Sequence, residues 1–227
     1  MINNLLRRIV ISILTMTFLL VGVLSAHAQT YTSTVKKVVD GDTIHLNQPV
    51  LGSTKMRLLS IDTPETNFQG KNQGEHAFAA TNYLTQLLPS GTKVTIELGE
   101  ECKDQYGRLL GHVYKSSLDV NKEMVRKGHA VTYFIYPNIN HFTEYQSALV
   151  QAKNKGLGIW SRNNPLEELP FVFRARVSQR GLTKWVVDSQ TKQIYAPHEY
   201  TKVPVERRLF FMSKSEATDF IRETINK

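Results

Sequence analysis

Cysteine is almost absent from this 227-residue chain, and its scarcity limits how the fold can be stabilised. Cys102 is the single cysteine, so no disulfide can form within the chain. Stability must therefore come from a buried core, for which this length is sufficient. Cys102 lies near Asp104 but has no histidine close to it in the sequence that would activate it. We therefore interpret it as a lone thiol and not as a nucleophile.

Paired histidines are also lacking. The spacing of the histidines shows no pair typical of zinc ligands, which disfavours a metal centre bound by histidines; they include His45, His76, His112, His129, His141 and His198. The segment 161–227 contains no pattern of metal ligands either.

The sequence has only one long apolar run, residues 9–24. It is shorter than the roughly 20 residues that a membrane-spanning helix needs. Arg7 and Arg8 precede the run and Ala26-His27-Ala28 follows it, which is the pattern of a signal peptide, residues 1–28, cleaved near Ala28-Gln29. We expect a secreted or periplasmic protein without a stable membrane span in the mature chain. An uncleaved membrane anchor is the alternative.

Acidic residues are the scarcer charge, with 20 against 28 basic residues and a net charge of +8. Removal of residues 1–28 deletes only Arg7 and Arg8, and 26 basic residues against 20 acidic ones leave +6. Such a basic protein suits an anionic partner, either nucleic acid or an anionic membrane.

The first half of the mature chain has the pattern of a β-meander interrupted by a helix. Apolar and β-branched periodicity predicts strands at 31–39, 43–46, 56–61, 93–98 and 109–114, and helices at 74–88, 121–127 and 144–154. Asn121 is the expected N-cap of the second helix. Five strands with a helix inserted after the third predict a mainly β fold with α-helices, a small five-stranded barrel capped by helices.

The remaining residues predict a linker at 161–170 and a small β-rich accessory domain at 171–227. Residues 171–178 alternate as in a strand, with Phe171 and Phe173 on one face and Arg174 and Arg176 on the other. Strands are also expected at 185–187, 193–195 and 209–212, before one helix that a capping box opens at Ser213. Segment 161–227 has twelve basic and eight acidic residues, net +4. Three roles are open for this segment. It would hold substrate through phosphate contacts, or dock on the cell envelope or a partner protein, or simply form a packed, solvated accessory domain.

Two acidic turns and two arginines carry the candidate chemistry. They lie in Asp40-Gly41-Asp42-Thr43, in residues 57–65 and in Asp104-Gln105-Tyr106-Gly107-Arg108. Oxygen ligands for a hard cation, a spare carboxylate and two guanidinium groups are what metal-assisted phosphodiester cleavage requires. Taken singly, each motif also fits an ordinary hairpin turn, a solvated loop charge or a surface ion pair.

These motifs, together with residues 120–128, resemble the staphylococcal nuclease-like (thermonuclease) family in the same order over about residues 33–160. The resemblance implies that residues 29–160 form a nuclease domain with an OB-fold barrel. It further implies one Ca²⁺ ion and hydrolysis of DNA and RNA with little sugar specificity. It also implies cleavage of the bond from phosphorus to the 5′ oxygen, leaving 3′-phosphate ends. We expect the protein to act as a monomer.

The resemblance also implies a role for each matching residue. Asp42 and Asp62 would bind the metal through their carboxylates, and Thr63 through its backbone carbonyl. Glu65 would orient or deprotonate the attacking water, and the forked guanidinium groups of Arg57 and Arg108 would clamp the phosphate. Tyr106 and Tyr133 would contact the nucleotide, or else pack at the barrel rim.

The chain departs from the family pattern at positions that bear on nucleotide affinity. Gln105 stands where the best-known member has a basic residue, and Ile135 where that member has tyrosine, with Tyr136 following. The 66–73 segment has Lys71 as its only charge. Two other function classes stay open: a non-catalytic OB-fold protein that binds single-stranded nucleic acid, and an envelope-associated protein acting through its basic C-terminal domain.

Overall fold

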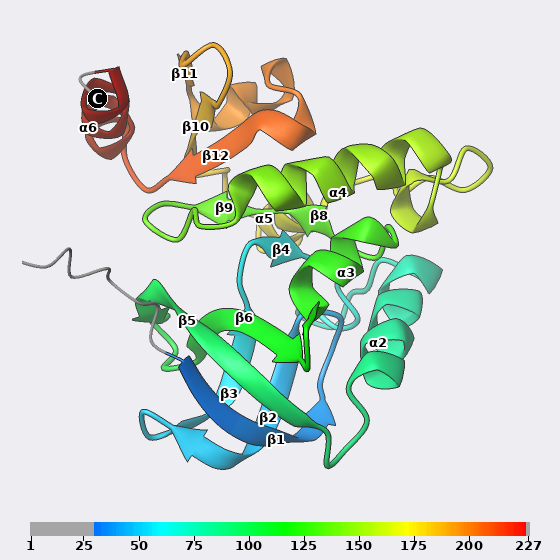
Figure 1. Ribbon diagram of the computed structural model, residues 1–227. Helices are drawn as coiled ribbons and strands as arrows, with labels where there is room; N and C mark the ends of the chain where they lie inside the picture. Colours follow the sequence, from blue (N-terminus) through cyan, green and yellow to red (C-terminus); the bar gives the residue numbers. More distant parts are fainter. Residues whose placement is uncertain (1–29, 226–227) are drawn as a thin grey trace, which may run out of the picture.

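The computed structural model describes residues 30–225, and the predicted signal peptide lies outside the described residues. Five strands form a closed mixed barrel, drawn in blue to green in Figure 1: β1 (Thr30–Val38), β2 (Thr43–Val50), β3 (Ser53–Leu58), β5 (Lys93–Lys103) and β6 (Leu109–Lys115). Their order is β3-β2-β1-β5-β6, and β7 (Leu118–Asp119) extends the sheet beyond β6. Parallel pairing of β3 with β6, with Met56 opposite Leu109, closes the barrel. The predicted fold class is confirmed.

Alternation along the strands fills the barrel interior. Val35, Ile44, Met56 and Ile96 are fully buried and belong to one continuous core. Irregularities in register, between Val35 and Lys37 in β1 and between Leu98 and Lys103 in β5, let the long strands curl around this core.

Three helices cover the barrel: α2 (Glu75–Leu87), α3 (Val120–Arg126) and α4 (Phe142–Lys155). Asp119, and not the predicted Asn121, is the N-cap of α3, because its carboxylate accepts from the Lys122 amide. Asn121 is fully buried, where its amide donates to the carbonyl of Leu59 and its side-chain oxygen accepts from the Val113 amide. It therefore ties α3 to the barrel.

The predicted third strand is broken in two. β3 ends at Leu58, and a two-residue strand, β4 (Ile61–Asp62), pairs instead with β8 (Val131–Thr132). Ser60 lies between them with φ of 66°, in the left-handed region, so the chain turns sharply there. This turn places Asp62 above the end of the barrel instead of continuing along its wall.

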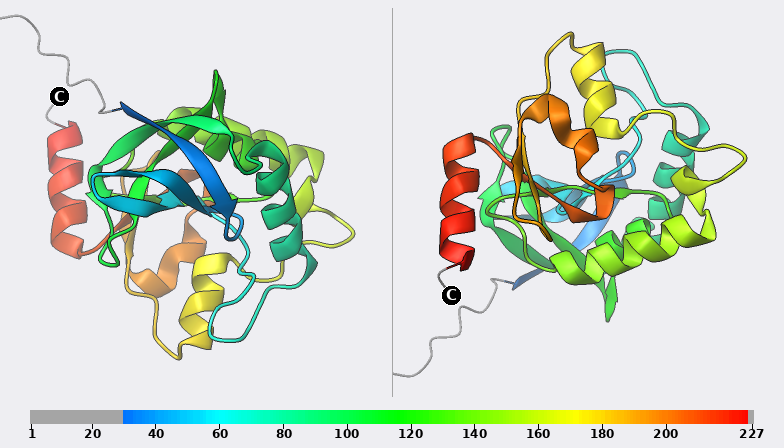
Figure 2. Two further views of the ribbon diagram at one scale, coloured as in Figure 1. Left: turned by 90° about the horizontal axis from the view of Figure 1, so that it is seen from below. Right: turned by 90° about the horizontal axis from the view of Figure 1, so that it is seen from above.

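The C-terminal segment forms a layer over one end of the barrel (Figures 1 and 2). It contains α5 (Pro170–Val177), β10 (Trp185–Asp188), β11 (Ile194–Tyr195), β12 (Arg208–Phe211) and α6 (Lys214–Ile225), with 3₁₀ turns at η1 (Gly158–Trp160), η2 (Pro197–Lys202) and η3 (Val205–Arg207). The second sheet has the order β11-β10-β12-β9, and β9 (Phe134–Ile135) comes from the predicted nuclease part. Phe211 and Ala217 join the core cluster of the barrel. The predicted boundary at residue 160 therefore crosses a shared sheet and a shared core.

The expected strand at 171–178 is wrong, because these residues form helix α5. Pro170 occupies its first turn, where a fixed φ favours the helix and no amide is lost. The predicted strand would have placed Arg174 and Arg176 on one face. In a helix they lie about 200° apart, so they reach different partners. Among residues 30–225, no helix is long and apolar enough to span a membrane.

A buried histidine makes the stability of the fold depend on pH. His112 is 3% exposed, and its Nδ1 lies 2.8 Å from the Tyr145 hydroxyl, which donates to Asp119. Burial, with a further contribution from His141, lowers the pKa of His112 from 6.5 to about 3. In this range the unfolded chain binds a proton that the folded chain does not, so stability falls as the pH falls below 6.5.

We expect His112→Gln to remove up to about 1.4 kcal/mol per pH unit from the slope of the unfolding free energy below this pH. Urea denaturation at several pH values between about 6.5 and 5, where most carboxylates stay ionised, measures the slope. His198→Gln, at an exposed position, should leave it unchanged. An equal slope in wild type and His112→Gln would contradict the account.

Candidate active site

Adjacent strands bring Asp42 and Arg57 together. Thr43 on β2 is the cross-strand partner of Arg57 on β3, so Asp42 lies at the strand entrance beside the arginine. Nη2 of Arg57 lies 3.1 Å from Oδ2 of Asp42. The Leu58 amide also donates to the Asp42 carbonyl at 2.8 Å, which fixes the backbone of the acidic turn against β3.

Asp62 reaches the same point from the short strand β4. Its Oδ1 accepts from Nη2 of Arg57 at 3.0 Å, so one guanidinium nitrogen touches both carboxylates. Asp62 is fully buried and Asp42 is 6% exposed. Two ionised carboxylates that are this close together and buried repel each other, so they require positive charge between them.

Two hydrogen bonds from Thr63 fix the orientation of the Asp42 carboxylate. The amide and the hydroxyl of Thr63 both donate to Oδ2 of Asp42, at 3.0 and 2.9 Å. The Asp-Thr-Pro-Glu turn is therefore joined to the Asp-Gly-Asp-Thr turn by hydrogen bonds and not only by proximity. Thr63 is itself buried, at 2% exposure.

Glu65 lies at the mouth of this cluster, with 19% of its side chain exposed. Its amide donates to the Gln73 side chain at 3.0 Å, and the Gln73 amide donates back to the Glu65 carbonyl at 2.9 Å. The Gln73 side chain then donates to the carbonyl of Glu168 at 2.7 Å. Gln73, which sequence reasoning missed, thus fixes the Glu65 loop to the C-terminal segment.

The cluster carries an excess of buried negative charge. Burial, and then the neighbouring Asp42, raise the pKa of Asp40 from 3.8 to about 7. Burial likewise raises the pKa of Glu65 above its ordinary value, although Arg174 opposes the shift. Such a site favours the binding of a cation.

A close approach at Gly41 supports this geometry. A Cβ added there would lie 2.6 Å from Oγ1 of Thr63 and 2.9 Å from Cβ of Ala80 on α2. We expect Gly41→Ala to push Thr63 aside, lowering the unfolding free energy by about 1–3 kcal/mol and reducing cleavage with it. Gly181→Ala is the matched control, since a Cβ there meets no atom within 4 Å. Thermal denaturation and a cleavage assay test both effects, and equal behaviour of the two variants would contradict the prediction.

Arg108 and Tyr106 are not drawn into the carboxylate cluster. Nε of Arg108 donates to Oδ2 of Asp104 at 2.7 Å, and its guanidinium lies 5.8 Å from the centre of the Tyr106 ring. Tyr106 is 75% exposed. The loop therefore holds Arg108 in its own ion pair with Asp104 through Nε.

Tyr133 is covered by the C-terminal segment. Its ring stacks on Phe171 of α5, with centroids 5.4 Å apart and planes 13° from parallel, and it contacts Phe210 of β12 at 4.7 Å. Lys184 Nζ lies 6.0 Å from the same ring. Burial raises the pKa of the Tyr133 hydroxyl. In this structure Tyr133 packs against other aromatic side chains, which is the second of its two predicted roles. Its contact with a nucleotide stays a prediction.

Arg174 is the main site residue that sequence reasoning did not find. From α5 its Nη1 and Nη2 donate to Oδ1 and Oδ2 of Asp62 at 2.8 and 2.9 Å, and Nη1 also donates to Glu65 at 2.5 Å. The signal in the sequence was Pro170, which is typical of the start of a helix. A helix at this position would have placed Arg174 and Arg176 on different faces. Arg176 pairs instead with Glu168 at 2.8 Å.

The donor set fits a hard cation. Asp42, Asp62 and the carbonyl of Thr63 offer oxygen atoms only, which suits calcium better than zinc or copper. In the described range 30–225, no group of three or more His, Cys, Asp or Glu side chains is arranged to hold an ion. Two carboxylates and one carbonyl would leave the rest of the shell to water and a phosphate oxygen.

Comparisons with known proteins identify the family of the chain. The family model of staphylococcal nuclease homologues matches residues 55–162. The chain is 33% identical over 128 residues to a thermonuclease of Staphylococcus intermedius, covering 56% of this chain and 75% of that protein. It is 35% identical over 156 residues to an uncharacterized endonuclease of Haemophilus influenzae, covering 68% and 81%. The chain therefore belongs to the staphylococcal nuclease family, as its motifs predicted.

Another relative extends the similarity into the C-terminal segment. Endonuclease YhcR of Bacillus subtilis is 47% identical over 195 residues, which is 82% of this chain. This alignment is longer than the family match and must include residues on at least one side of it. The chain spans only 16% of the length of that relative.

Proposed function

We propose that the protein is a calcium-dependent endonuclease that hydrolyses DNA and RNA with little sugar specificity. The observation that carries this proposal is the convergence of Asp42, Asp62, Arg57 and Glu65 on one point at the end of the barrel. Family membership supports nuclease activity. The resemblance to the family supports calcium, the two substrates and the position of cleavage, and the geometry supports the roles of the residues.

In this proposal, Asp42 and Asp62 bind the ion through carboxylate oxygens and Thr63 through its carbonyl. Both carboxylates touch the same Arg57 nitrogen, so they face a common centre. When bound, calcium supplies positive charge that neutralises a non-bridging phosphate oxygen and lowers the barrier to attack by water. The two hydrogen bonds from Thr63 keep Asp42 oriented before the ion arrives.

Arg57 binds the phosphate beside this centre. Its side chain is 15% exposed, so substrate can reach the guanidinium while the carboxylates hold it in position. Charge grows on the phosphate oxygens as water attacks, and the fixed donors of Arg57 interact more strongly with that charge. Arg108, immediately before the neighbouring strand β6, would supply a second guanidinium group to the phosphate.

Glu65 orients the attacking water and accepts its proton. It lies near Asp62 without being needed as a ligand, and its loop is fixed by Gln73. Water then attacks phosphorus, the bond to the 5′ oxygen breaks, and that oxygen takes up a proton from solvent, so the products carry a 3′-phosphate and a 5′-hydroxyl end. The predicted signal peptide supports action outside the cytoplasm, in the periplasm or the medium.

The proposal is tested with residues 29–227 and three end-labelled substrates: single-stranded DNA, duplex DNA and RNA. We expect cleavage of all three with calcium and none with a calcium chelator. A 3′ phosphatase should change the mobility of the upstream product, and a 5′ kinase should label the downstream one. Binding without cleavage in any divalent metal would move the protein to the class of OB-fold nucleic-acid-binding proteins.

A further inference from the structure

An arginine from outside the family match pairs with one of the two carboxylates proposed as metal ligands. Arg174 donates to both carboxylate oxygens of Asp62 and to Glu65, while Oδ1 of Asp62 also accepts from Arg57. Both oxygens of Asp62 are therefore engaged by guanidinium nitrogens at 2.8–3.0 Å. Calcium binds carboxylate oxygens at about 2.3–2.6 Å, so an ion at Asp62 would compete with these nitrogens for the same oxygen lone pairs.

The helix that carries Arg174 is firmly packed. Phe171 on α5 contacts Tyr133, Tyr200 and Phe210 through ring pairs 5.2–5.4 Å apart, and it forms a second hydrophobic cluster with Val186 and Val203. Detaching α5 would expose this aromatic cluster, which is costly. The flexible Arg174 side chain, however, can leave Asp62 by rotation while the helix stays in place.

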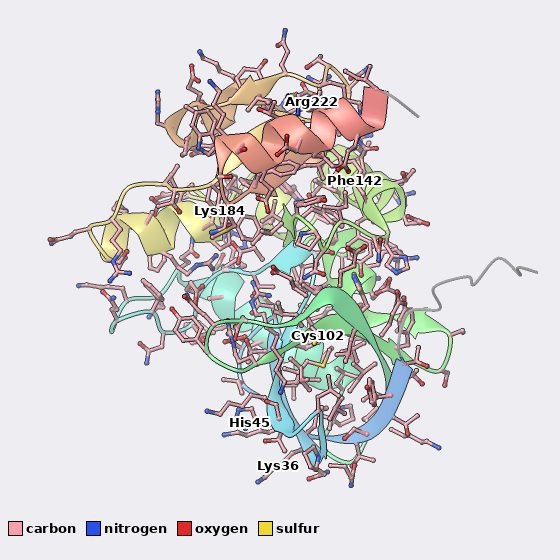
Figure 3. All side chains as sticks on the ribbon, turned by 90° about the vertical axis from the view of Figure 1, so that its left-hand side faces the viewer. Lys36, His45, Cys102, Phe142, Lys184 and Arg222 are labelled. Carbon is pink, nitrogen blue, oxygen red and sulfur yellow. The ribbon has the colours of Figure 1, made fainter. Side chains whose placement is uncertain are left out.

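Further positive charge surrounds the same position. Lys184, which comes from the C-terminal segment, lies between the upper layer and the barrel (Figure 3). Burial and the charge of Arg174 both lower the pKa of Lys184, and Asp62 opposes them, so the three groups interact. The C-terminal segment thus directs cationic side chains at the carboxylates of the barrel.

We propose that Arg174 is an affinity-determining and positioning residue of the active site: it holds Asp62 and Glu65 in place in the absence of calcium, and calcium must displace it from Asp62 in order to bind. This inference rests on the proposed calcium site. It makes the C-terminal segment part of the site, because calcium affinity would be set by competition with a residue beyond 162.

The test measures calcium affinity directly, by isothermal titration calorimetry on the 29–227 protein without nucleic acid. We expect Arg174→Gln to bind calcium at least about 10-fold more tightly than wild type, since glutamine cannot form the charged pair with Asp62. Arg176→Gln is the matched control on the same helix, because Arg176 pairs with Glu168 instead. Its affinity should stay within about twofold of wild type.

Thermal denaturation provides a second readout. Loss of Arg174 leaves Asp62 with less positive charge, so Arg174→Gln should melt at a lower temperature than wild type without calcium. Saturating calcium should raise its melting temperature by more than that of wild type, because the ion replaces the missing charge. Arg174→Lys keeps the charge but loses the fork, and we expect an intermediate calcium affinity. It also serves as the test variant should Arg174→Gln not fold.

The outcomes separate this inference from the proposed function. Calcium binding by wild type that Arg174→Gln and Arg174→Lys leave unchanged or weaken would overturn the competition and leave the calcium site intact. No calcium binding by wild type and by both variants would overturn the calcium site and the competition together. Tight binding by Arg174→Gln with weak binding by wild type is the predicted result.

Discussion

Glu65→Gln is expected to lower kcat by about 10²–10⁴-fold while calcium affinity falls by no more than about threefold. The reason is geometric: Glu65 lies beside Asp62 and shares Arg174 with it, but the two carboxylates proposed as ligands are Asp42 and Asp62. Glutamine keeps the size of the side chain and removes its ability to accept a proton. Cleavage kinetics at saturating calcium, with calorimetry alongside, measure both quantities.

The control is Glu223→Gln, at an exposed position on α6, which should leave both quantities unchanged. Two outcomes would contradict the assigned role of Glu65. A large loss of calcium affinity in Glu65→Gln would indicate that Glu65 is a metal ligand. An unchanged kcat would indicate that Glu65 takes no part in the reaction.

Arg57→Ala is the second change with a large expected effect, a loss of about 10²–10³-fold in kcat/KM. Arg57 has two tasks, because the nitrogen that bridges Asp42 and Asp62 belongs to the guanidinium group that would bind the phosphate. Arg57→Lys should rescue little, since an ammonium group that pairs with the two carboxylates has no planar fork left to bind the phosphate. Arg222→Ala, on exposed α6, is the control.

Removing Arg57 also leaves two buried carboxylates with less positive charge, so folding must be checked at saturating calcium by thermal denaturation. A folded Arg57→Ala protein that binds calcium and still cleaves at more than about a tenth of the wild-type rate would contradict the proposed phosphate contact.

The barrel was predictable because its information is local. Alternation of apolar residues marks each strand, and the Asp-Gly turn joins β1 to β2. The register of neighbouring strands then places Thr43 opposite Arg57, which brings Asp42 beside the arginine. The break at Ser60 was not predictable in this way, because residues 56–61 are apolar enough for a continuous strand and the turn depends on pairing of β4 with β8.

The C-terminal contribution to the site was not predictable from pattern alone. Phe171 and Phe173, two residues apart, fit the two-residue period of a strand, and eight residues are too few to reveal the helix that buries them both. The contacts of Arg174 and of Tyr133 join positions far apart in the chain, and the parallel pairing of β12 with β9 that supports them has no local signal. Tertiary packing decided these features.

The most direct test of the central claim is a calcium titration of DNA cleavage by the wild-type 29–227 protein and by Asp42→Asn and Asp62→Asn variants. The account predicts cleavage that rises with calcium and saturates in wild type, and half-maximal activity shifted to at least about tenfold more calcium, with a lower maximum, in both variants. Wild-type cleavage that a calcium chelator leaves unchanged, or variants that match the wild-type calcium curve, would contradict a calcium-dependent nuclease site built on these two carboxylates.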